Sequence, residues 1–97
     1  MDLEFNWDRV KAESNLRKHH ISFDEATTVF YDPLSLIFDD EEHSISEKRE
    51  IIIGYSKNRN LLLVFFTERN KRIRIYSARK ATKMERKDYE ENKHEQY

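Results

Sequence analysis

Cysteine is absent from the sequence, and glycine and proline occur once each. Without cysteine the chain cannot form disulfides, a thiol nucleophile, or the cysteine-based sites that bind zinc and iron–sulfur clusters. The single glycine, Gly54, excludes phosphate-binding loops and dinucleotide-binding fingerprints, which need several glycines. So little glycine and proline also leaves little room for a flexible linker. Packing alone must therefore stabilise the fold.

Long apolar runs are missing too. The longest, Leu61–Phe66, has six residues, whereas a membrane-spanning helix needs roughly 20. The first residues include acids and lack the apolar stretch of a secretory signal. We therefore expect a soluble, cytoplasmic protein with no membrane association.

Neither sign of charge dominates, since there are 18 Lys and Arg against 19 Asp and Glu, for a net charge of −1. This balance excludes a uniformly basic nucleic-acid binder. The charges are nevertheless segregated: residues 39–50 contain six acids and two bases, and residues 69–87 contain nine bases and one acid. The basic segment is suited to phosphate groups. The alternative interpretation is a solvated surface on a small domain.

A capping residue precedes each of three expected helices. Asp8 is a plausible N-cap for the first. The other two begin with capping boxes, in which Ser or Thr is followed three residues later by Glu: Ser22 with Glu25, and Thr82 with Glu85. The second helix should end at Asp32-Pro33, because proline disfavours helical backbone at the residue before it. The expected helices span residues 9–19, 23–31 and 83–93.

Strand-like segments fill the rest of the chain. A short strand is expected at Leu3 and Phe5, and four later segments are rich in β-branched, aromatic and aliphatic residues. These four segments are 34–38, 50–55, 61–67 and 72–77. Links of hairpin length predict that the last three form a meander, and the run 61–66 suits a central strand covered on both faces. The 97 residues thus predict one α+β domain, residues 1–97, with an antiparallel sheet, two N-terminal helices and one C-terminal helix.

The last expected strand carries cations on one face. Arg72, Arg74 and Tyr76 alternate with Ile73 and Ile75, so the two sets should lie on opposite faces. Two guanidinium groups beside an aromatic ring can hold a phosphate and stack a base. This strand is therefore a candidate nucleic-acid interface.

Histidine placement gives no sign of a metal site. The four histidines are His19, His20, His43 and His94, and no pair has the spacing of a metal-binding helix. No serine stands in a glycine-flanked nucleophile elbow, which excludes that form of Ser-His-Asp site. We expect neither a metal nor a cofactor.

Three sequence blocks carry a family resemblance. They are a W-D-x-x-K start at residues 7–11, a K-H-x-x-S-F-x-E-A block at 18–26 and an S-A-R-x-A-T block at 77–82. Together they resemble the BrnT family of toxins. The resemblance implies a RelE-like fold and a ribonuclease of a type II toxin–antitoxin system, which arrests growth by cutting RNA. It also implies a BrnA-like antitoxin with a DNA-binding ribbon-helix-helix part, in a complex of two toxins and two antitoxins.

Two positions depart from that family pattern. His20 and Asn70 stand where the family usually has glycine. A left-handed backbone at either position would therefore place a side chain where glycine is less costly.

RNA can be cut without metal when its own 2′-hydroxyl attacks the neighbouring phosphorus. This reaction needs a base, an acid and cations that stabilise the developing charge. Arg79 and Arg74 are the first candidates for holding the scissile phosphate. The candidate RNA-binding residues are Arg49, Arg69, Arg72, Tyr76 and Lys80.

The sequence leaves two candidates for each proton-transfer role. Glu68 or His19 could be the base, and Tyr89 or His43 could be the acid. Neighbouring arginines would lower the pKa of Glu68, which makes it a weaker base and a candidate orienting partner for Arg69. Tyr89 could equally anchor the final helix.

A non-enzymatic function is the second hypothesis. The final helix has few apolar residues, and the segment 39–50 is acidic. Both features are typical of surfaces that meet a complementary chain. On this interpretation the protein is a non-catalytic module that pairs with a DNA-binding antitoxin.

Overall fold

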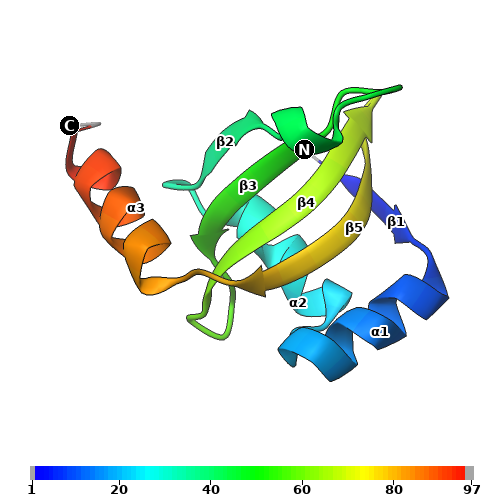
Figure 1. The fold of residues 1–97 in the computed structure, drawn as a ribbon, viewed down its shortest axis with the longest axis horizontal. Helices are drawn as coiled ribbons and strands as arrows, with labels where there is room; N and C mark the ends of the chain where they lie inside the picture. The colour runs from blue at the N-terminus through cyan, green and yellow to red at the C-terminus, as the bar shows by residue number, and fades with distance from the viewer. Residues whose placement is uncertain (1, 96–97) are drawn as a thin grey trace.

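The structure, a computed structural model, describes residues 2–95 and the side chains of residues 2–92. Within that range the chain forms a five-stranded sheet in the order β1-β5-β4-β3-β2. The strands are β1 (Glu4–Trp7), β2 (Leu36–Asp39), β3 (Glu50–Tyr55), β4 (Leu61–Arg69) and β5 (Arg72–Lys80). The helices are α1 (Arg9–His19), α2 (Phe23–Thr28) and α3 (Lys83–Glu95), with 3-10 turns η1 (Val29–Tyr31) and η2 (Glu41–His43). The predicted order of elements and the α+β class are confirmed (Figure 1).

The sheet is mixed, which corrects the prediction of a purely antiparallel one. Strands β2 to β5 pair antiparallel, but β1 pairs parallel to β5. Short turns impose antiparallel pairing only on strands that they join directly. Because β1 runs straight into α1 and not into a hairpin, its direction was not fixed by a turn.

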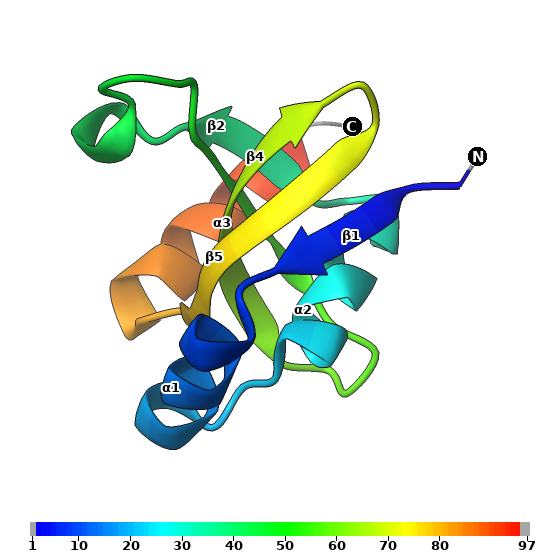
Figure 2. The same cartoon turned by 90° about the vertical axis from the view of Figure 1, so that its right-hand side faces the viewer.

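The two faces of the sheet are covered by different helices (Figures 1 and 2). We call them the α1–α2 face and the α3 face. The α1–α2 face holds the larger core, in which Ile52, Val64 and Ile75 pack with Phe23 and other buried residues. The α3 face holds a smaller cluster around Leu63 and Tyr89. Strand β4 lies in the middle of the sheet, and Leu61–Val64 is buried, as its apolar run predicts.

A β-bulge in β5 changes which side chains share a face. Phe66 pairs with Ile75, whereas the preceding Phe65 pairs with Ser77, so β5 contains one extra residue at Tyr76. Bulges of this kind redirect the side chains that follow them. Ile75 and Ala78 both lie in the α1–α2 core. Beyond the bulge Arg79 therefore lies opposite Leu63, on the α3 face.

Asn15 fixes α1 against this bulge. It is buried, and its amide nitrogen donates hydrogen bonds to the carbonyl oxygens of Ile21 and Ala78, at 3.0 and 2.8 Å. Its Oδ1 accepts from Ala78 N at 3.1 Å and from Ser77 Oγ at 3.2 Å. Pairing between β1 and β5 ends at Ile75. Asn15 thus satisfies the backbone N–H and C=O groups of Ala78, at the edge of β5 that β1 no longer covers. It also places the last turn of α1 beside the bulge.

Helix α3 is attached mainly by polar contacts. Tyr89 is its buried apolar side chain among residues 83–92, and its hydroxyl donates to Leu34 O at 3.1 Å. The hydroxyl of Tyr55 donates to Glu90 at 2.9 Å, and Met84 is 67% exposed. The weak apolar packing expected of this helix is confirmed. Within residues 2–95, none of the helices combines the length and the apolar character of a bilayer-spanning segment.

Candidate active site

A hollow of about 370 Å³ opens on the α3 face where the bulge exposes the second half of β5. We call it the central hollow. Residues from five parts of the chain line it: His19, Asp40, His43, Arg49, Phe65, Tyr76, Ser77 and Arg79. Five of the residues proposed for the site from the sequence therefore meet in one place, although they come from separate parts of the chain: His19, His43, Arg49, Tyr76 and Arg79.

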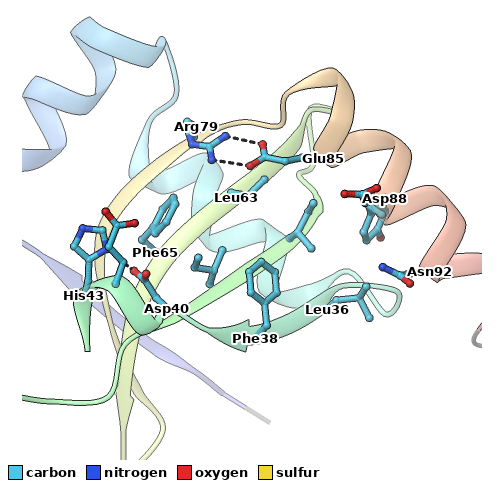
Figure 3. Close-up of a pocket in the computed structure, with 14 residues that line it drawn as sticks. Leu36, Phe38, Asp40, His43, Leu63, Phe65, Arg79, Glu85, Asp88 and Asn92 are labelled. Carbon is cyan, nitrogen blue, oxygen red and sulfur yellow. Dashed lines mark hydrogen bonds and ion pairs between the residues drawn. The ribbon is translucent and has the colours of Figure 1, made fainter. Parts of the chain in front are cut away.

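Arg79 is held in a two-point ion pair with the first turn of α3. Its Nη1 and Nη2 donate to the two carboxylate oxygens of Glu85 at 2.7 and 2.8 Å (Figure 3). The hydrogen bond from Arg79 lowers the pKa of Glu85 to about 2, and that from Glu85 raises the pKa of Arg79. Glu85 also accepts from Thr82 N at 2.9 Å as part of the predicted capping box. The guanidinium is thus charged and rigidly placed, but a carboxylate already neutralises part of its field.

Arg49 lies over the ring of Tyr76. The centre of its guanidinium is 4.0 Å from the ring centroid, a cation–π distance. The hydroxyl of Tyr76 donates to Glu47 at 2.6 Å. The pKa of Tyr76 is raised, mainly by burial and secondly by this hydrogen bond to Glu47. Arg49 Nε is buried without a hydrogen-bond partner, the one such side-chain atom within the described residues. Tyr76 therefore supports Arg49 and has one face covered. Arg49 Nε lies 3.7 Å from Glu47 Oε1, an ion pair longer than a hydrogen bond, so that it retains capacity to donate.

Asp40 and His43 form a pair at the other side of the central hollow. His43 Nδ1 lies 2.9 Å from Asp40 Oδ2 (Figure 3). The carboxylate is buried, with 7% of its side chain exposed, whereas 51% of the His43 side chain is exposed. Asp40 was not among the residues singled out from the sequence. The signal that could have found it is the i, i+3 spacing of Asp40 and His43, which places both on one side of a single helical turn.

Two of the proposed proton-transfer groups lie elsewhere. Glu68 pairs in register with Ile73, so it lies on the α1–α2 side of the sheet and outside the central hollow. Tyr89 is 2% exposed and donates its hydroxyl to a backbone carbonyl. Of the candidate bases and acids, His19 and His43 line the central hollow, whereas Glu68 and Tyr89 do not. The side chain of His94 lies outside the described residues.

The remaining cations divide between two places. A second hollow of about 260 Å³ adjoins the first at Tyr76 and contains Arg69, Arg72 and Arg74; we call it the basic hollow. Arg74 Nη1 donates to Asn6 Oδ1 at 2.7 Å, which holds the arginine beside β1. Lys80 pairs in register with Leu62 and so lies on the α1–α2 side, away from both hollows. Apart from Lys80, the residues predicted to bind phosphate therefore line two hollows that meet at Tyr76.

An apolar groove runs beside the central hollow, between the sheet and α3. Its volume is about 510 Å³, and we call it the α3 groove. Figure 3 shows Asp40 and His43 at one end, Asp88 and Asn92 at the other, and Arg79 paired with Glu85 along its rim. Phe38 and Leu36 contribute apolar surface from β2. No group of three or more His, Asp or Glu side chains in the described part of the chain is arranged to hold a metal ion.

Comparisons with known proteins identify the fold and the family. A crystal structure of the Brucella abortus ribonuclease toxin BrnT superposes with a TM-score of 0.64, at 19% sequence identity, over 84% of this chain and 100% of that one. This likeness shows a shared fold. No curated protein matches the chain by sequence. A sequence model of one family matches residues 7–85, and it describes the ribonuclease toxin, BrnT, of type II toxin–antitoxin systems. Since that match covers well over half of the sequence, the chain belongs to the BrnT family of ribonuclease toxins.

Proposed function

We propose that this toxin cleaves RNA at the central hollow by metal-independent transesterification. The 2′-hydroxyl attacks the adjacent phosphorus while His19 accepts its proton. Arg79 and Arg49 stabilise the charge that develops on the phosphate, and His43 protonates the leaving oxygen. The observation that carries the proposal is the convergence of two imidazoles and two guanidiniums on one hollow.

The basic hollow would hold the RNA backbone next to the reacting phosphate. Arg69, Arg72 and Arg74 line it, and Tyr76 is shared with the central hollow. Contacts of this kind are electrostatic and independent of base sequence. They would therefore contribute affinity, and binding should weaken as salt concentration rises.

The test is cleavage of RNA by pure protein in excess chelator. We expect an upstream fragment that ends in a 2′,3′-cyclic phosphate or a 3′-phosphate. A matched pair of variants assigns the activity to the hollow. His19→Asn should abolish most cleavage, whereas His20→Asn should retain it, because His20 does not line the hollow and asparagine tolerates its left-handed backbone at φ 60°. An absolute need for added magnesium would contradict the mechanism.

The partner follows from the type II system, in which an antitoxin neutralises the toxin. We propose a BrnA-like ribbon-helix-helix antitoxin, two toxins and two antitoxins per complex, and a cytoplasmic location for the single toxin domain of residues 1–97. The α3 groove supports the existence of a protein partner, because Phe38, an apolar side chain that lines it, is 47% exposed. Size measurement of the purified complex tests the stoichiometry.

A non-catalytic role in pairing with the antitoxin is the second candidate. The observation in its favour is that Glu85 already occupies two donors of Arg79. Growth of bacteria that express either wild type or Arg79→Ala separates the two. Equal growth would favour the pairing module, and arrest by wild type alone would favour the nuclease.

A further inference from the structure

The acidic segment that looked like a partner surface contains a carboxylate with a different role. Asp40 lies in the stretch of residues 39–50, whose other acids are exposed or half-buried. It is 6% exposed as a whole residue. Removing a carboxylate from water is costly unless a partner compensates. His43 supplies that compensation through the 2.9 Å contact between its Nδ1 and Asp40 Oδ2.

The backbone around the pair is fixed by its own hydrogen bonds. Asp40 N donates to Arg49 O at 2.9 Å, which continues the pairing of β2 with β3. Ser44 Oγ donates to Asp40 O at 2.7 Å and accepts from Arg49 N at 3.0 Å. The turn that carries His43 is therefore tied to the segment that carries Arg49. One local structure positions both a proton-transfer group and a phosphate-binding group.

The contact also determines which nitrogen of His43 carries a proton. An ionised carboxylate can only accept hydrogen bonds, so Nδ1 must donate. Nε2 is left as the nitrogen that Asp40 does not engage. The titratable and charged groups that line the same two hollows as the ring are Asp40, His19, Arg49 and Arg79 in the central hollow, and Glu42, Glu85 and, at its far end, Asp88 in the α3 groove.

We propose that Asp40 is a positioning residue that keeps Nδ1–H of His43 directed at its carboxylate, so that Nε2 carries the second proton of the doubly protonated ring and donates it to the leaving 5′-oxygen of RNA. The bond between the 2′-oxygen and phosphorus forms as the bond between phosphorus and the 5′-oxygen breaks. The proton of the 2′-hydroxyl passes to His19, and the Nε2 proton of His43 passes to the 5′-oxygen. The products are a 2′,3′-cyclic phosphate and a 5′-hydroxyl. This inference rests on the proposed function and adds the residue that makes His43 effective.

The test compares two RNA substrates that differ in the leaving atom. One has the ordinary 5′-oxygen, and the other has sulfur at that bridging position, which leaves without needing a proton. We expect His43→Gln to slow cleavage of ordinary RNA by about 10²–10⁴-fold and Asp40→Asn by about 10²-fold, the range of a lost general acid. On the sulfur substrate both variants should be within about tenfold of wild type, a smaller loss than general acid catalysis supplies.

Asp39→Asn is the matched control, because Asp39 is an exposed neighbour whose nearest cation, Lys48 Nζ, is 3.7 Å away. It should cleave both substrates at the wild-type rate. Near wild-type cleavage of the sulfur substrate by Asp40→Asn would also show that this variant is folded. Equal slowing on both substrates would mean that Asp40 is merely structural and would overturn the proposal. Unchanged cleavage of ordinary RNA by Asp40→Asn would overturn it as well.

A measurement without RNA separates this inference from the proposed function. The ¹⁵N signals of the neutral His43 ring should show hydrogen on Nδ1 in wild type. In Asp40→Asn the hydrogen should move to Nε2, because an amide can donate to Nδ1. Hydrogen on Nε2 in wild type would overturn the positioning role even if RNA is cleaved. Hydrogen on Nδ1 in a protein that cuts neither substrate would instead refute the nuclease mechanism, and with it the proton transfer from His43.

Discussion

The two faces of the sheet differ in how they are held together. On the α1–α2 face, apolar side chains pack closely and two buried polar residues, Asn15 and Glu25, are each satisfied by several hydrogen bonds. On the α3 face the helix contributes one buried ring, and ion pairs and hydroxyl contacts do the rest. The comparison teaches that the closely packed face and the face that carries the proposed site lie on opposite sides of one sheet. A close-packed face supports a more polar face on which a substrate can be placed.

The largest expected effect is on stability, and it comes from replacing one of two adjacent phenylalanines in β4. Phe66 is buried on the α1–α2 face with its ring 4.9 Å from that of Phe30, whereas Phe65 is half-buried on the α3 face. We expect Phe66→Ala to lower the free energy of unfolding by about 3–5 kcal/mol, the cost of a large cavity in a packed core. Phe65→Ala should cost clearly less. Urea titrations of the two variants measure the difference, and equal losses would contradict the division between faces.

Arg79→Ala should have the next largest effect, and on cleavage more than on folding. We expect the rate of RNA cleavage to fall by about 10²–10³-fold, which is the effect of removing one preorganised group that stabilises the transition state. Because the side chains of Arg79 and Glu85 are each about 30% exposed, the ion pair should contribute about 1 kcal/mol or less to stability. Cleavage assays and thermal unfolding measure the two effects. Cleavage at the normal rate would remove Arg79 from the mechanism.

Tyr89→Phe distinguishes an anchor from an acid. It removes the hydroxyl that donates to Leu34 O and keeps the buried ring. If Tyr89 is an anchor, the free energy of unfolding of the variant should fall by about 1 kcal/mol, the net value of one hydrogen bond. Cleavage should remain close to that of wild type. A loss of cleavage by about 10²-fold or more would instead identify the hydroxyl as the general acid.

The smallest expected effect is the loss of thermal stability at acid pH when Glu85 of α3, in its ion pair with Arg79, is protonated. The pKa of Glu85 is about 2 in the folded chain and 4.5 for a free glutamate. A lowered folded pKa means that the ion pair stabilises the fold above the free value and loses this contribution as the pH falls toward 2. Wild type should therefore lose more thermal stability than Glu85→Gln between pH 6 and pH 2.5. Parallel pH profiles for the two proteins would contradict this assignment.

Local signals in the sequence were sufficient for most of the fold. The bounds predicted for α1 and for β3 match those observed. The Thr82–Glu85 capping box is confirmed by reciprocal bonds of 2.9 and 3.1 Å. Ser22 is confirmed as an N-cap, since its Oγ accepts from Glu25 N at 3.0 Å, but the Glu25 carboxylate accepts from Ser56 and Asn60 instead of completing the box. His20 and Asn70 have φ of 60° and 54° and tolerate the conformation that the family usually gives to glycine. These features depend on residues close together in the chain, and short-range patterns report them.

Features that depend on distant residues could not be predicted in the same way. The parallel pairing of β1 joins Glu4 to Arg72, and no local turn specifies it. Helix α2 ends at Thr28, three residues before the expected end at residue 31, and a 3-10 turn continues to Tyr31. For the site, Arg79, Arg49 and His19 were named from residue type and resemblance. The pairing of Arg79 with Glu85, and the burial of Asp40, appear only when the strands and turns are assembled.

The extra residue in β5 determines which side chains of the strand lie on each face of the sheet. Before Tyr76, even-numbered side chains such as Arg74 lie on the α3 face of the sheet, and beyond it the odd-numbered Arg79 does. If this stretch kept all its residues but paired with β4 without the bulge, the two sets beyond Tyr76 would be exchanged. The strand would then bury a guanidinium and expose an alanine without a change in any side-chain type. In this short stretch the pairing of the backbone with β4 is therefore as much a determinant of the proposed site as the identity of its residues.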